Sequence, residues 1–203
     1  TERAAWHALF ERHIGKGNGR RALDLASGTA VISHLMHDLE FAVTGLDWSE
    51  TMLEKARAKS KQRGSNIQFL LGDAENTLEP DNSYDVIVTR HLVWTLVDPA
   101  AAFVEWFRVL TPGGKLLVVD GDFVSSTWAS KLNKAMADVM QSLGLRKAAE
   151  VAPQMKTHRD ILARVHFSGG ARSDEVSAML RQTGFDPITV DFDLKQIHSA
   201  QKK

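Results

Sequence analysis

Cysteine is absent from this sequence of 203 residues, and its absence excludes disulfide bonds, thiolate nucleophiles and cysteine metal sites. An excess of charge is also absent, because lysine plus arginine and aspartate plus glutamate each number 25. Proteins that bind nucleic acid are usually basic, so we expect no nucleic-acid partner. No apolar run approaches the ~20 residues of a membrane span, so we expect no membrane partner and a cytoplasmic location.

The composition is otherwise ordinary, with 43% hydrophobic and 25% charged residues. A chain of this length is most simply one domain, and we expect residues 1–203 to form it. His34 and His37 have the spacing of two metal ligands on one face of a helix. No third ligand completes such a site, so we expect no metal and interpret both histidines as part of a solvated helix face.

Segments typical of strands alternate with segments typical of helices, which predicts an α/β fold with a Rossmann-like, mostly parallel sheet and helices on both faces. The expected strands are about 21–25, 41–47, 66–71, 84–89, 115–120 and 188–194, the last near a sheet edge. The expected helices are about 2–13, 29–38, 49–61, 98–110, 132–143 and 173–183. The Pro-Gly-Gly sequence at 112–114 predicts a turn at 111–114.

The strongest ligand-binding signal runs from Asp24 to Ala30, where a short strand ends in small residues and a helix begins. Small side chains let a ligand touch the main chain, and a helix N-terminus offers free N–H groups. Asp47 ends the next strand, roughly twenty residues later, as expected when an acid binds a ribose in a βαβ unit. Together these features predict an adenosine cofactor.

Two further segments complete a family pattern. Gly72-Asp73-Ala74 follows the third expected strand, and Arg108 to Lys115 leads into the fifth. With the Asp24–Ala30 turn and Asp47, they resemble the class I S-adenosylmethionine-dependent methyltransferases over about residues 22–194. The resemblance implies the class I methyltransferase topology, S-adenosyl-L-methionine as cofactor and S-adenosyl-L-homocysteine as its product.

The resemblance also implies roles for the residues at these turns. Asp47 bridges the two ribose hydroxyls, and Asp73 accepts from the adenine amino group while the N–H of Ala74 meets a ring nitrogen. Asp24 orders the loop or reaches the amino group of the methionine part, and Trp48 packs on adenine or against protein. The alternatives are a surface acid for Asp47 and a turn-forming acid for Asp73. The residues expected to bind the cofactor are Asp24, Ala26, Ser27, Gly28, Asp47, Trp48, Asp73, Ala74 and Arg90.

Two of the three family glycines are replaced, by Ala26 and Ala30, and only Gly28 remains. Alanine disfavours positive φ, so we expect either ordinary backbone angles at these positions or weaker cofactor binding. Dinucleotide-binding turns have the spacing G-x-G-x-x-G, whose third glycine would fall at Val31. This bulky residue makes a nicotinamide cofactor the second choice.

Arg90 and His91 leave the fourth expected strand at its C-terminal end, the edge that holds the ligand in open α/β sheets. We interpret His91 as a candidate general base and Arg90 as a group that binds an acidic part of the acceptor. The alternative for both is a structural hydrogen bond. Residues 121–172 are expected to be an insertion that covers the acceptor pocket. Its expected walls are Arg90, His91, Trp94, Asp120 and Asp122, with His158 and His166 over it. The alternative for Asp120 and Asp122 is to cap a turn.

The resemblance implies transfer of a methyl group, and we expect an oxygen or nitrogen atom of a small molecule as its acceptor. The zero net charge supports a small acceptor. The Asn/Asp-Pro-Pro-aromatic run of enzymes that methylate amino groups of nucleic acids and protein amides is replaced by Thr89-Arg90-His91. An RNA or protein methyltransferase remains an alternative, as does a non-catalytic S-adenosylmethionine-binding module, which the two lost glycines suggest.

Overall fold

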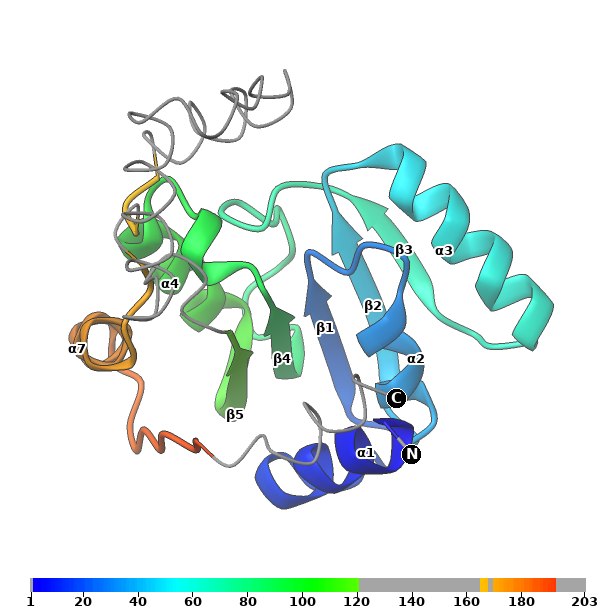
Figure 1. Ribbon diagram of the computed structural model, residues 1–203, viewed down its shortest axis with the longest axis horizontal. Coiled ribbons are helices and arrows are strands. Elements are labelled where there is room, and N and C mark those ends of the chain that lie inside the picture. Colours follow the sequence, from blue (N-terminus) through cyan, green and yellow to red (C-terminus); the bar gives the residue numbers. More distant parts are fainter. Residues whose placement is uncertain (1, 121–164, 168–169, 193–203) are drawn as a thin grey trace, which may run out of the picture.

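The computed structural model describes residues 2–120, 165–167 and 170–192. Its centre is a parallel sheet of five strands in the order β3-β2-β1-β4-β5 (Figure 1). The strands are β1 (Arg21–Leu25), β2 (Ala42–Asp47), β3 (Gln68–Leu71), β4 (Tyr84–Arg90) and β5 (Leu110–Val119). The helices are α1 (Glu2–His13), α2 (Val31–His37), α3 (Glu50–Arg63), α4 (Pro99–Val109) and α7 (Ser173–Thr183), with a 3-10 turn η1 (Val93–Thr95).

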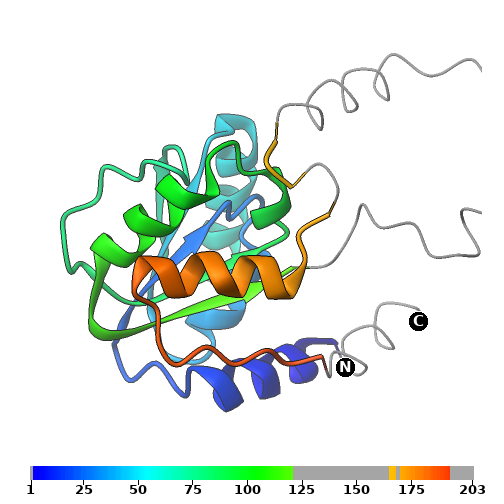
Figure 2. The same cartoon turned by 90° about the vertical axis from the view of Figure 1, so that its left-hand side faces the viewer.

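Helices cover both faces of the sheet, as the sequence predicts. Successive strand residues point to opposite faces, so Val86 and Val88 of β4 pack with α1 and α2, whereas Ile87 packs with α4 and α7. Figure 2 shows α7 lying alongside α4 on the second of these faces. A strand buried on both faces needs a continuous apolar run, which is why 86–88 was recognisable as a strand.

The parallel arrangement brings the carboxyl ends of all five strands to one edge of the sheet, the upper edge in Figure 1. The loops that follow β1, β2, β3 and β4 therefore start side by side. Asp98 caps α4 through a 3.0 Å bond from the N–H of Ala101 to its carboxylate, and Pro99 occupies the first turn, as expected. The fold thus collects the predicted ligand-binding turns at a single edge.

Two of the expected elements are wrong. Residues 111–114 belong to β5, where the pairing register shifts between Tyr84 and Val86, so the small residues form an irregularity inside a strand. Residues 188–192 form no strand in the described part of the chain, and the side chain of Phe192 is 80% exposed. Asp191 instead forms ion pairs with Arg12 and His13 of α1. An alternating pattern needs a sheet edge to pair with, which the pattern itself cannot supply.

The interpretation of His34 is also wrong, because its side chain is buried and not solvated. Its Nδ1 lies 3.3 Å from the hydroxyl of Ser65, and burial lowers the pKa of the imidazole to about 4. His37 accepts a 3.3 Å hydrogen bond from the N–H of Asn66. The expected helix at 132–143 and most of the expected insertion at 121–172 lie outside the described residues. Among the helices that are described, none has the length and apolarity to span a bilayer.

Candidate cofactor and acceptor site

The turn after β1 uses left-handed backbone angles at three positions. The φ angles are +55° at Ala26, +54° at Gly28 and +62° at Ala30, so the expectation of ordinary angles at the two alanines is wrong. Hydrogen bonds across the turn impose this geometry, including 3.0 Å from the N–H of Ser27 to the carbonyl of Leu46 and 2.8 Å from Ala30 to Ser27. The turn therefore has the backbone shape that glycine favours, held in place by its neighbours.

Space is left beside the middle of this turn. A Cβ added at Gly28 would meet no atom within 4 Å, so the backbone there is open to a ligand. The hydroxyl of Ser27 is buried and has no hydrogen-bond partner among the described residues; it packs against Gly45 of β2, whose missing side chain makes room for it. The turn thus pairs an open face at Gly28 with a packed face at Ser27.

Asp24 fastens the end of β1 to the first turn of α2. Its carboxylate is almost completely buried and accepts a 2.5 Å hydrogen bond from the hydroxyl of Ser33. Burial raises the pKa of Asp24 to about 7, against the opposing effect of the bonds from Ser33. This geometry matches the ordering role expected for Asp24.

Asp47 connects the turn after β1 to the start of α3. One carboxylate oxygen accepts a 2.8 Å bond from the N–H of Gly28, and the other accepts a 2.9 Å bond from the N–H of Ser49. A carboxylate oxygen can accept two hydrogen bonds, so each keeps one acceptor position. The backbone carbonyl of Asp47 also accepts a 3.0 Å bond from Gly72, which joins this site to the loop after β3.

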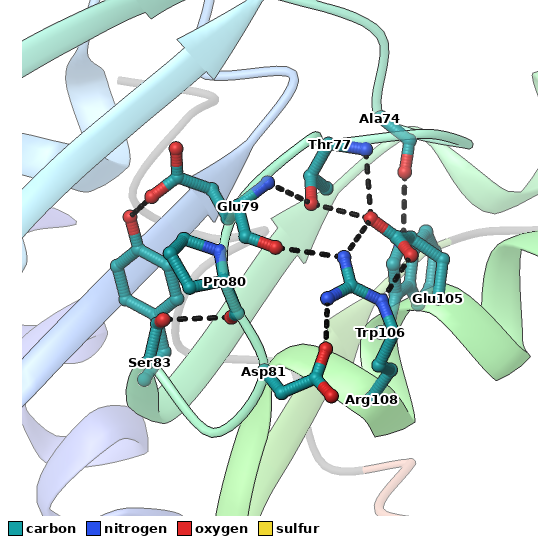
Figure 3. Close-up of polar contacts among 10 residues, drawn as sticks. Ala74, Thr77, Glu79, Pro80, Asp81, Ser83, Glu105, Trp106 and Arg108 are labelled. Carbon is teal, nitrogen blue, oxygen red and sulfur yellow. Dashed lines mark hydrogen bonds and ion pairs between the residues drawn. The ribbon is translucent and has the colours of Figure 1, made fainter.

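Two groups border these acids. Trp48 directly follows Asp47 and is 84% exposed, so its indole makes little contact with the described protein. Asp73 is exposed and accepts a 2.9 Å bond from the N–H of Glu75, the turn-forming geometry foreseen as its alternative role. The carbonyl of Ala74 accepts a 2.7 Å bond from the indole N–H of Trp106, and its own N–H has no partner among the described residues (Figure 3).

This donor and acceptor set fits S-adenosylmethionine. The remaining acceptor positions of Asp47 suit two ribose hydroxyls, and the open backbone at Gly28 leaves room for the chain that carries the sulfonium. The unpaired N–H of Ala74 suits a ring nitrogen of adenine.

A second group of side chains lies where β4 and β5 end. His91 has φ +59°, and its backbone N–H donates to Val119 at 3.1 Å. Its Nε2 accepts a 3.1 Å bond from Nε of Arg90, and its Nδ1 lies 3.9 Å from a carboxylate oxygen of Asp120. Burial, and then the charge of Arg90, lower the pKa of His91. Asp120 also accepts a 2.8 Å bond from the N–H of Val93, so it caps the turn after β4. Arg90, His91 and Asp120 therefore lie close together where β4 and β5 end.

The remaining expected walls are placed only in part. Asp122 and His158 lie outside the described residues. The N–H of His166 donates to Leu96 just after η1, at 3.2 Å, and its ring lies 3.4 Å from the carboxylate of Glu175. Trp94 lies within η1, directly after the exit of β4. The described residues contain no group of three or more side chains that could hold a metal ion.

Sequence reasoning missed two tryptophans that support these groups. Trp6 of α1 lies under Arg90, with the guanidinium carbon 5.2 Å from its ring centroid. Trp106 of α4 bonds Ala74. Both are buried. A buried indole N–H usually finds a partner, which is a signal for the contact of Trp106 although it does not name the partner residue. The indole N–H of Trp6 has no hydrogen-bond partner among the described residues, and its contact with Arg90 is made by the ring face.

Comparison with known proteins points to one family. A family model described as "Methyltransferase domain" matches residues 16–184. The ubiquinone/menaquinone biosynthesis C-methyltransferase UbiE of Shewanella sediminis is 30% identical over 195 residues, which are 90% of this chain and 73% of that protein. The demethylmenaquinone methyltransferase of Renibacterium salmoninarum is 35% identical over 115 residues, 57% of this chain but only 47% of that protein.

The fold is shared with solved structures. One of them, a putative S-adenosyl-L-methionine-dependent methyltransferase from Methanococcus maripaludis, superposes with a TM-score of 0.64 at 22% identity. The match covers 94% of this chain and 80% of that one. The expected class I topology is therefore confirmed at the level of the fold.

Proposed function

The chain belongs to the methyltransferase domain family, and from this we propose that it transfers a methyl group from S-adenosylmethionine to a small organic acceptor, leaving S-adenosylhomocysteine. The observation that carries the proposal is the bond between Asp47 and Gly28. This bond joins Asp47, an acid suited to bind a ribose, to the turn of small residues at the same edge of the sheet.

Bound S-adenosylmethionine supplies an electrophilic methyl group on a sulfonium. In this proposal Asp47 holds the ribose, Asp73 and Ala74 hold the adenine, and Trp48 covers it. Asp24 keeps the turn in place through Ser33. Such a transfer needs little from the protein beyond alignment and exclusion of water, because positioning of the reacting atoms provides most of the rate gain.

His91 and Arg90 act on the acceptor in this proposal. Burial and the charge of Arg90 lower the pKa of His91, which favours the neutral imidazole. Its Nε2 accepts a bond from Arg90, so in this proposal the acceptor's hydroxyl replaces Arg90 at Nε2 before the proton is transferred. A phenolic hydroxyl that loses its proton becomes nucleophilic both at oxygen and at the neighbouring ring carbon. The relatives named as C-methyltransferases support a carbon acceptor. We therefore extend the acceptor atom, predicted as oxygen or nitrogen, to a ring carbon.

The lost glycines were the reason to consider a non-catalytic module. Ala26 and Ala30 have left-handed angles, the conformation that glycine favours, so the turn has this shape without the two glycines. This observation favours the enzyme over the module.

The proposal is tested by incubating the protein with S-adenosylmethionine labelled in its methyl group and a metabolite extract, with total RNA and total protein in parallel reactions. We expect label in small molecules with the wild type, and less of it with Asp47→Ala when the cofactor is not saturating. Label confined to RNA or protein would identify the alternative acceptor class. Tight cofactor binding without transfer to any fraction would identify a non-catalytic module.

A further inference from the structure

The connection between β3 and β4, residues 72–83, carries Asp73 and Ala74 but contains no helix or strand of its own. Bonds within the loop shape part of it, including those from the N–H groups of Glu75 and Asn76 to Asp73. Other polar atoms of the loop are bonded to α4, which lies beside it (Figure 3). The position of Asp73 and Ala74 therefore depends in part on side chains of α4.

Trp106 makes the contact closest to the expected adenine position. Its side chain is fully buried, and its single polar atom donates to the carbonyl of Ala74 at 2.7 Å. The N–H of Ala74, on the same residue, has no partner in the described part of the chain. The carbonyl of Ala74 shares a rigid peptide plane with the N–H of Glu75, so this bond fixes the backbone directly after Ala74. Only the φ and ψ rotations of Ala74 separate that plane from its own N–H, and the bond therefore limits the positions that this N–H can take.

Glu105, next to Trp106, holds the following turn of the loop. One of its carboxylate oxygens accepts from the N–H of Thr77 at 2.9 Å and from its hydroxyl at 2.6 Å. Arg108 donates to both oxygens of Glu105 at 2.8 Å, and these hydrogen bonds are the main cause of the lowered pKa of that carboxyl. Arg108 also bonds Asp81 and the carbonyl of Glu79, so the whole arrangement is anchored at its far end.

A carboxylate of the loop also bonds the segment that leads into α4. Glu75 accepts bonds of 2.8 Å and 2.9 Å from the N–H groups of Val97 and Asp98, just before α4. Contacts therefore run in both directions between the loop and this helix. Charged hydrogen bonds of this kind are stronger than neutral ones and favour a single geometry.

We propose that Trp106 and Glu105 are positioning residues that aim Asp73 and the N–H of Ala74 at the adenine ring, and so determine selectivity for an adenosyl cofactor. This inference rests on the proposed function. Inosine is the informative comparison, because it presents a carbonyl where adenine has an amino group and an N–H where adenine has an acceptor nitrogen. Both differences fall on the atoms that Asp73 and Ala74 would read.

The test is calorimetry of S-adenosyl-L-homocysteine and S-inosyl-L-homocysteine with wild type and Trp106→Phe. Loss of one hydrogen bond that orients the loop should weaken adenosyl binding by about threefold to tenfold, with little change for the inosyl compound. The matched control is Phe103→Leu on the same helix, whose ring packs 5.3 Å from that of Trp106. It disturbs the packing but keeps the bond to Ala74, so selectivity should be retained.

Thr77→Val provides a second variant that leaves α4 unchanged and serves if Trp106→Phe does not fold. It removes the hydroxyl bond to Glu105 and should lower selectivity in the same direction. Equal losses for both compounds, or unchanged selectivity in a folded variant, would overturn the positioning role. Failure of the wild type to bind S-adenosylhomocysteine would instead overturn the proposed function, and this inference with it.

Discussion

Asp47 accepts a 2.8 Å hydrogen bond from the backbone N–H of Gly28, a residue that precedes it by 19 positions. The bond joins the loops that follow two neighbouring parallel strands, β1 and β2. The same carboxylate bonds Ser49 at the start of α3. Asp47 thus stabilises the turn at Gly28 and, in the proposed function, also binds the ribose.

Asp47→Ala is expected to weaken binding of S-adenosylhomocysteine by roughly 1–3 kcal/mol, the scale for losing hydrogen bonds to a charged group. Isothermal titration calorimetry measures this directly. Glu54→Ala, at an exposed position of α3, is the control and should bind normally. Unchanged affinity in the folded Asp47 variant would remove this residue from the site.

Ala26→Gly and Ala30→Gly should stabilise the turn. A left-handed conformation costs a non-glycine residue roughly 1–2 kcal/mol, whereas the added chain entropy of glycine costs up to about 1 kcal/mol. We expect the free energy of unfolding to rise by up to about 1 kcal/mol for each change, with cofactor binding retained or tightened. Ala58→Gly, at an exposed helical position of α3, should instead lower it by about 1 kcal/mol. Equal destabilisation by all three substitutions would contradict the angles described above.

Asp24→Asn should change how stability depends on pH. Burial raises the pKa of Asp24 from 3.8 to about 7 in the folded protein. The folded protein favours the protonated form of Asp24. The contribution of this form to the free energy of unfolding is fully present below pH 4 and is lost as the pH rises to about 7. Asparagine does not ionise, so the stability of the variant relative to wild type should increase across this range. Urea unfolding at a series of pH values measures the difference, and parallel profiles would count against the raised pKa.

Arg90→Met should raise the pKa of His91, because the charge of Arg90 is the second cause of its lowering after burial. Arg90→Lys keeps a positive charge and should largely keep the lowered value. Titration of the His91 ring protons by NMR distinguishes the two variants without any assay of turnover. An identical pKa in both would show that burial alone is responsible.

His91→Asn should reduce turnover by about 10²–10⁴-fold if the imidazole is a general base, with affinity for S-adenosylhomocysteine unchanged. The pH–rate profile should also lose the limb that corresponds to protonation of His91. A smaller loss that is the same at every pH would assign His91 to orienting the acceptor.

The sequence predicts those features of the site that follow from strand order. Asp24, Asp47 and Asp73 lie at or close to the carboxyl ends of parallel strands, and parallel strands bring such positions to one edge. The backbone angles of Ala26 and Ala30 could not be predicted in this way, because bonds from neighbouring strands impose them against the preference of alanine.

Other features depend on partners that a local pattern does not name. The alternation at 188–192 gives no strand, since a strand also requires an edge with free bonding groups. The contact of Trp106 with Ala74 joins residues 32 positions apart, and no spacing rule connects them. Patterns along the chain therefore predict elements and edges, while contacts between elements decide how the loops are held.

The stacking of Arg90 on Trp6 restricts the directions from which an anion can reach the guanidinium at the end of β4. The guanidinium lies over the buried indole ring of Trp6, so an anion can approach it only from its rim or from the side away from the indole. A planar acid lying edge to edge with Arg90 would gain two parallel bonds, whereas a spherical anion would gain no such advantage. Through Trp6, the first helix of the chain thereby favours anions of planar shape at this edge, in addition to the preference for negative charge that Arg90 gives.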